Sequence, residues 1–135
     1  MWLKGLQMRA SIGTLLYATS ASLLCVGVLA CHNTDTPLRV VEGGVARRGP
    51  AAIQKYGCGS CHEIPGVKRA DGMVGPPLIH FARRTFIGGE VPNTAEHLIT
   101  WITVPQAIEP GTAMPNMGVT DEEARDIAAY LYTLR

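Results

Sequence analysis

Two cysteines and a histidine lie close together in the stretch Cys58-Gly59-Ser60-Cys61-His62. The spacing C-x-x-C-H is the signature by which a c-type haem is attached to a protein. It brings two thiols within reach of the two vinyl groups of one porphyrin, and the histidine that follows can bind the iron. The stretch therefore predicts one covalently bound haem, with Cys58 and Cys61 as attachment points and His62 as an iron ligand.

Two other uses of paired cysteines fit the sequence less well. A thioredoxin-like redox pair is expected after a strand in a βαβ unit, and no such pattern precedes Cys58. A zinc site needs four ligands, usually from a second cysteine or histidine pair. The other histidines, His32, His80 and His97, are scattered, so we favour haem attachment.

A second iron ligand is expected from the loop over residues 105–119, which contains Met114 and Met117. The loop is too rich in proline and glycine for a helix or strand, and long loops of this kind in compact domains are usually functional. A thioether suits the sixth position of haem iron and raises its reduction potential. Met114, framed by Pro110 and Pro115, is the better candidate. Met117 is the alternative, and either could instead fill the core.

Other residues have types that suit the surroundings of a haem. The rigid Gly-Pro-Pro-Leu segment over residues 75–78 could offer one of its carbonyls to the second ring nitrogen of His62, which would orient that ligand and make it more basic. The adjacent Arg83 and Arg84 could pair with haem propionates, although a solvated pair is an equal alternative for either one. Trp101 could line the pocket and donate its indole N–H to a propionate.

The composition agrees with a buried prosthetic group and argues against some classes of function. The 135 residues suffice for one small domain. The net charge of +1 gives no basic surface for nucleic acid. Only two Phe, two Trp and four Tyr are present, so a macrocycle would supply apolar mass to an otherwise aromatic-poor core. No acid, base or nucleophile constellation stands out, and we do not expect an enzyme.

Residues 1–30 are predicted to be a signal peptide or a membrane anchor. Lys4 and Arg9 form a positive start, and no formally charged residue follows until residue 35. A positive start followed by an apolar run is typical of a secretory signal or of an uncleaved transmembrane helix. The length of the run alone does not separate the two, because about 17–25 residues can span a bilayer.

The end of the apolar run, Val28-Leu29-Ala30-Cys31, resembles a bacterial lipobox. Cleavage there would leave Cys31 as a lipidated N-terminus, which would anchor the chain stably. With either anchor, the rest of the chain is expected on the outer face of the bacterial cytoplasmic membrane, the periplasmic side. Residues 31–46 are polar and are expected to form a tether, and residues 47–135 are expected to form the folded domain.

Helix signals occur in three places in residues 47–135. The first helix is expected over residues 47–56, with Pro50 in its first turn and Gly57 ending it. A capping box of Asn93 and Glu96 predicts a second helix, which runs to about residue 103. A further capping box predicts the last helix, whose apolar stripe follows a helical period. That box and stripe consist of Thr120, Glu123, Ala124, Ile127, Ala128 and Leu131.

Taken in order, these motifs resemble a class I, His/Met-ligated bacterial cytochrome c. The order is a helix, CxxCH, GPPL, a capped helix with tryptophan, the loop P-G-T-A-M-P and a C-terminal helix. The resemblance covers residues 47–135 and implies a small all-α fold of three to four helices around one haem c. It implies a crossing of the first and last helices near Gly49, Ile53 and Tyr130.

The resemblance also implies roles for the site residues. They are thioether attachment by Cys58 and Cys61, proximal and distal iron ligation by His62 and Met114, a carbonyl from Pro76, and propionate binding by Arg84 and Trp101.

The function expected from this reasoning is membrane-tethered transfer of single electrons between partners of a respiratory chain, such as a quinol-oxidising complex or a terminal oxidase. One alternative is a haem subunit held in a larger membrane oxidoreductase. Another is a haem enzyme or gas sensor, which would need an open or labile sixth position on the iron.

Overall fold

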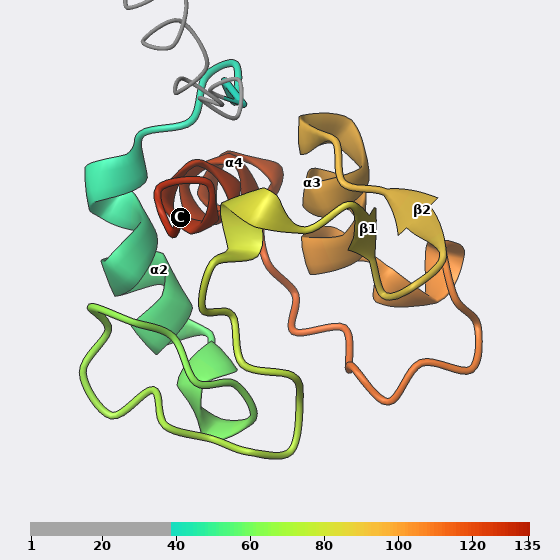
Figure 1. Ribbon diagram of the computed structural model, residues 1–135, viewed down its shortest axis with the longest axis horizontal. Helices are drawn as coiled ribbons and strands as arrows, with labels where there is room; N and C mark the ends of the chain where they lie inside the picture. The colour runs from blue at the N-terminus through green and yellow to red at the C-terminus, as the bar shows by residue number, and fades with distance from the viewer. Residues whose placement is uncertain (1–38) are drawn as a thin grey trace, which may run out of the picture. The chain divides into compact units, whose positions relative to one another are not determined.

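The computed structural model describes residues 39–135, which form a small domain of three α-helices and one short β-ribbon (Figure 1). The helices are α2 (Gly49–Lys55), α3 (Ala95–Thr103) and α4 (Asp121–Leu131). Strands β1 (Phe86–Ile87) and β2 (Val91–Pro92) pair antiparallel. Single 3-10 turns occur at Ala46–Arg48, Cys58–Ser60, Phe81–Arg83 and Pro105–Ala107. The predicted small all-α fold is confirmed.

The predictions for residues 1–30 and for Cys31 lie outside the described residues. Within residues 39–135, the structure contains no helix that is long and apolar enough to cross a membrane.

Helix α4 is the centre of the domain, because both α2 and α3 pack against it (Figure 1). Gly49, at the start of α2, allows the closest approach. A Cβ atom there would lie 2.4 Å from the Cβ of Tyr130 and 2.7 Å from the Asp126 carbonyl oxygen. Only a residue without a side chain fits such a contact between two helix backbones. The crossing of the first and last helices is thus found where the resemblance implied it.

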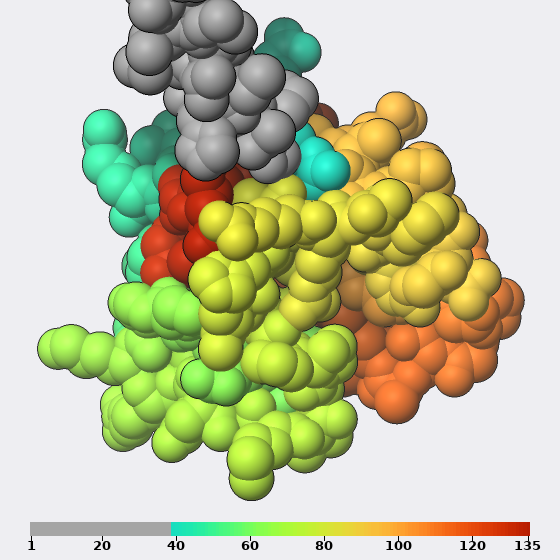
Figure 2. Space-filling model, in the orientation of Figure 1, coloured from blue at the N-terminus to red at the C-terminus, as the bar shows by residue number. Residues whose placement is uncertain are grey.

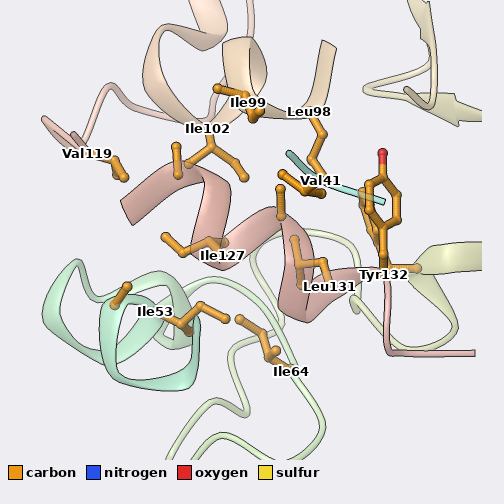
Figure 3. Close-up of a cluster of buried hydrophobic side chains, with 14 of the residues drawn as sticks. Val41, Ile53, Ile64, Leu98, Ile99, Ile102, Val119, Ile127, Leu131 and Tyr132 are labelled. Atoms are coloured by element: carbon orange, nitrogen blue, oxygen red, sulfur yellow. The ribbon is translucent and has the colours of Figure 1, made fainter. Parts of the chain in front are cut away.

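The core lies between these helices and the loops that join them (Figure 3). Ile53 of α2 and Ile64 of the following loop point toward Ile127 and Leu131 of α4 (Figure 3). Leu98, Ile99 and Ile102 cover α4 from the α3 side. The stripe predicted for the last helix is buried as expected, since Ala124, Ile127, Ala128 and Leu131 are each at most 4% exposed.

The capping residues are confirmed for one helix and corrected for the other. Thr120 caps α4, and its hydroxyl oxygen accepts a hydrogen bond from the Glu123 N–H. Helix α3 is capped by Thr94, not by Asn93, because Thr94 has the extended backbone of a cap and accepts from the His97 N–H.

Asn93 is buried, and its side chain forms hydrogen bonds that join other segments of the chain instead. Its amide nitrogen donates to the carbonyls of Phe81 and Arg84, and its oxygen accepts from the Tyr132 hydroxyl at 2.9 Å. Because the Asn93 oxygen is turned toward Tyr132 and Thr94 has the cap backbone, the predicted capping box does not form.

The end of the predicted tether is part of the folded domain. The Arg39 guanidinium donates to the carbonyls of Ala82 and Arg84, and Val41 is only 6% exposed. The Val45 N–H donates to the Asp126 carboxylate at 2.7 Å. The packed structure therefore begins before residue 47, and residues 31–38 of the predicted tether lie outside the described residues.

The contact at Gly49 leads to a prediction about stability. Gly49→Val should destabilise the domain by about 1–3 kcal/mol or more, because the new side chain must separate α2 from α4. The measurement is denaturant unfolding of the holoprotein. Ala51→Val, at an exposed position of the same helix, is the matched control and should cost only about 0.5 kcal/mol of helix propensity. Equal losses in the two variants would contradict a close packing role for Gly49.

Candidate functional site

A cavity of about 780 Å³ opens between the segment after α2, the ribbon, α3 and the loop before α4. Most of the residues proposed from the sequence for the site line this one cavity: Cys58, Cys61, His62, Pro76, Arg84, Trp101 and Met114. Met117 lines it as well, whereas Arg83 does not. Figure 2 shows two of its walls, the green segment after α2 and the orange loop before α4, as neighbours on one face.

The cysteines are presented by a turn that follows directly from the end of α2. Gly57 has a left-handed backbone (φ 69°), which ends the helix, and a 3-10 turn over Cys58–Ser60 follows. The N–H groups of Cys61 and His62 both donate to the Cys58 carbonyl, at 3.3 and 3.1 Å. Both cysteines are half-buried free thiols, and burial raises the pKa of the Cys58 thiol. The turn thus brings both thiols to the cavity.

The His62 ring is oriented by the backbone carbonyl predicted to hold it. Its Nδ1 lies 2.8 Å from the Pro76 carbonyl oxygen. A carbonyl can only accept, so Nδ1 carries the proton and donates it, which leaves the lone pair on Nε2. Gly75 makes room for the ring, because a Cβ there would lie 2.4 Å from His62 Cε1. The arrangement gives His62 one nitrogen free to bind a metal.

Two neighbouring side chains hold the backbone of Met114 through hydrogen bonds. Its N–H donates to the Thr112 hydroxyl oxygen at 3.2 Å, and its carbonyl accepts from the Gln106 amide at 2.9 Å. Met114 is half-buried, whereas Met117 is 43% exposed. Within the described residues, no side chain forms hydrogen bonds with the backbone of Met117 as Thr112 and Gln106 do with that of Met114. Thr112 and Gln106 were not singled out from the sequence, because polar side chains in a loop give no signal of what they bind.

Arg84 and Trp101 occupy the side of the cavity formed by the ribbon and α3. The Arg84 guanidinium lies 5.3 Å above the Phe81 ring and donates to the Pro77 carbonyl, and burial lowers its pKa. Trp101 packs against Gly88, where a Cβ would lie 2.7 Å from the indole. Arg84 forms no ion pair with any described residue. Its charge therefore has no carboxylate partner within residues 39–135.

A second network, which sequence analysis missed, joins the end of α2 to the start of α4. The Tyr56 hydroxyl donates to Glu123 at 2.5 Å, and the Lys55 ammonium donates to the same carboxylate at 2.8 Å. These two donors, with Thr120, lower the pKa of Glu123 to about 2. Because Tyr56 also lines the cavity, the network ties the wall that carries the cysteines to the loop that carries Met114.

The residues of the cavity fit a haem and do not fit the zinc alternative. The walls are mainly apolar, with Ile53, Ile64, Leu98 and Ile102 among them, which suits a porphyrin. They carry two thiols, one imidazole nitrogen and one thioether, the groups that attach a haem and bind its iron. Within residues 39–135, no three His, Cys, Asp or Glu side chains come together as a metal site.

Comparison with known proteins agrees with this donor set. The sequence profile of the family described as "Cytochrome c" matches residues 46–135. The chain belongs to the cytochrome c family. The cofactor of this cytochrome c domain is therefore one covalently bound haem c with its iron, as the CxxCH motif predicted, and the domain transfers electrons.

Three curated relatives carry the name cytochrome c oxidase subunit 2. The protein of Alkalihalophilus pseudofirmus is 30% identical over 67% of this chain, and that of Bacillus subtilis 30% over 70%. The protein of Bacillus sp. strain PS3 is 32% identical over 71% of it. The matches cover only 26–28% of the relatives' own lengths. No solved structure gave a significant match.

The Glu123 network predicts a contribution to acid stability. The pKa of Glu123 is about 2 in the folded protein, against an ordinary value of 4.5. A carboxylate whose pKa is lower in the folded than in the unfolded protein stabilises the fold at pH values above the unfolded pKa. This contribution is lost as the pH falls from about 4.5 toward 2. Glu123→Gln should therefore show a shallower loss of stability than the parent protein in that window, measured by unfolding at several pH values.

The matched control for this prediction is Glu90→Gln, an exposed carboxylate that forms no ion pair with the described residues. It should keep the pH dependence of the parent protein. A Glu123→Gln profile that runs parallel to that of the parent between pH 4.5 and 2 would contradict the role given to this carboxylate.

Proposed function

We propose that this chain is a membrane-tethered carrier of single electrons in a respiratory chain, with the haem iron bound by His62 and Met114. The proposal rests on one observation: two side chains that can bind iron, His62 and Met114, line the same cavity. The Nε2 of His62 is free because Nδ1 is used by Pro76, and Met114 is held on a separate, restrained loop. An iron with both axial positions filled exchanges electrons and has no site for a substrate.

In this proposal each cavity residue has a defined task. Cys58 and Cys61 attach the cofactor, and the Pro76 carbonyl keeps His62 oriented and makes it more basic. Gln106 and Thr112 fix the backbone of Met114. Arg84 and Trp101 bind the propionates, and the absence of a carboxylate partner for Arg84 within the described residues leaves its guanidinium free for this task.

The partners proposed are redox proteins of the same membrane, a quinol-oxidising complex as donor and a terminal oxidase as acceptor. The names of the relatives support the oxidase side. We further propose that the domain lies on the periplasmic side of the bacterial cytoplasmic membrane. It would be retained there by lipidated Cys31 or by an uncleaved N-terminal helix, as the charge-free run and the lipobox-like sequence suggest.

A second candidate function is that of a non-catalytic haem subunit in a larger oxidoreductase. It is favoured by the relatives, which are named as subunits of cytochrome c oxidase. Purification from mildly solubilised membranes separates the two. A free carrier elutes alone, whereas a subunit elutes with the other polypeptides of its complex and with their oxidase activity.

The axial ligand on the loop can be tested by two parallel substitutions. Met114→Ala should remove the weak far-red absorption band of a methionine–ferric iron bond, lower the reduction potential and allow rapid binding of carbon monoxide to the reduced protein. Met117→Ala, the matched control, should change none of these. The reverse pattern would make Met117 the ligand, and rapid carbon monoxide binding by the parent protein would favour the enzyme or gas-sensor alternative.

The restraint on Met114 gives a separate prediction. Gln106→Leu removes the donor to the Met114 carbonyl and should lower the temperature at which the far-red band disappears, because the loop then opens before the domain unfolds. Gln54→Leu is the control, since Gln54 donates to the Lys68 carbonyl away from the loop. If the far-red band of Gln106→Leu disappears at the same temperature as that of the parent protein, the hydrogen bond from Gln106 to the Met114 carbonyl does not hold the ligand.

A further inference from the structure

Three segments that are distant in sequence form one surface where the described chain begins. Arg39 donates to the carbonyls of Ala82 and Arg84 at 3.2 Å and lies 5.5 Å from the centre of the Tyr132 ring. The Ala82 N–H donates to the Leu134 carbonyl at 2.9 Å. We call residues 39–41, 79–85 and 133–135 the tether-entry patch, since the chain that precedes Arg39 reaches the domain here.

The tether-entry patch is positively charged and holds no acidic residue. Its charges are Arg39, Arg83, Arg84 and Arg135, and none of them forms an ion pair with any of residues 39–135. Because Arg84 is assigned to the haem propionates, Arg39, Arg83 and Arg135 are the charges left for another partner. The hydrogen bonds of Arg39 go to neutral carbonyls, so they do not cancel its charge. An α-carboxylate on Arg135 would still leave an excess of positive charge. Glu42, an exposed residue next to Val41, borders the patch. With its charge and the α-carboxylate counted against Arg39, Arg83 and Arg135, the balance remains positive.

If the chain is tethered as proposed, the short stretch between anchor and domain would keep the patch close to the membrane. Residues 39–45 are fixed to the domain by Arg39, by buried Val41 and by the bond from Val45 to Asp126. Only residues 32–38 then separate Cys31 from Arg39. Fully extended, this stretch reaches about 28 Å. The charge-free run ends at residue 34, so either of the proposed anchors would hold the patch within a short distance of the lipid surface.

We propose that the tether-entry patch rests on anionic lipid headgroups of the membrane that retains the chain. The inference rests on the tethering part of the proposed function. Guanidinium groups bind phosphate through paired hydrogen bonds, and basic residues are attracted to an anionic surface within roughly a Debye length, about 8 Å. Val40, 80% exposed in the same patch, can enter the interface. Since Arg84 lines the cavity as well, this contact orients the Arg84 edge of the cavity toward the lipid.

The test uses the full-length holoprotein, reconstituted into vesicles that carry a headgroup-labelled fluorescent lipid, which the haem quenches at short range. We expect stronger quenching in vesicles of phosphatidylcholine with phosphatidylglycerol than in phosphatidylcholine alone. The excess should disappear at about 0.5 M salt, where the Debye length falls to a few ångströms. The double variant Arg83→Glu with Arg135→Glu should reduce quenching in anionic vesicles to the neutral-vesicle level.

The matched control is Lys68→Glu with Arg69→Glu, which makes the same change in net charge on exposed residues of another loop. It should keep the excess quenching. Equal quenching of the parent protein in both kinds of vesicle would overturn the lipid contact while leaving the tether intact. A double patch variant that keeps full quenching but transfers electrons more slowly to its partner would overturn it too, and would assign the patch to an acidic protein. Failure of the protein to float with any vesicle would instead refute the tether itself.

Discussion

The backbone contact between α2 and α4 at Gly49 determines where both walls of the cavity lie. Helix α2 ends at the turn that presents Cys58 and Cys61, and α4 begins where the loop carrying Met114 ends. A change in the distance between the two helices would therefore move the cysteines relative to the methionine. The absence of a side chain at Gly49 lets the backbones meet, and the network of Lys55, Tyr56 and Glu123 fixes the other end of the same helix pair.

The parts of the fold that the sequence predicted correctly depend on local rules. Pro50 and Gly57 delimit α2 through the geometry of their own backbones, and Thr120 caps α4 with an atom of its own side chain. The CxxCH motif is equally local, because five consecutive residues contain the attachment chemistry and one ligand. The hydrogen bond between His62 and the Pro76 carbonyl joins residues 14 positions apart, so no local rule predicts it. It could be expected only because the resemblance to class I cytochromes c implied it.

The parts that were wrong or missed depend on contacts over long distances in sequence. Asn93 has the residue type of a cap, yet its amide is used by Phe81, Arg84 and Tyr132, which no local pattern reveals. The end of the predicted tether has the composition of a linker because it is polar and contains glycine, but Gly44 and Val45 pack against α4. Gln106 and Glu123 likewise acquire their roles only when the loop and the two helices have been brought together.

The pairing of the first helix with the last has a consequence for the order of events during synthesis. Val45 and Arg48 contact Asp126, which lies 81 and 78 residues further along the chain. The core of the domain therefore cannot close until almost the whole chain has been made, since contacts of this separation form late in folding. Until then Cys58 and Cys61 belong to an open chain, in which both thiols are accessible. The two thiols proposed as haem attachment points therefore stay accessible until the last helix has been made.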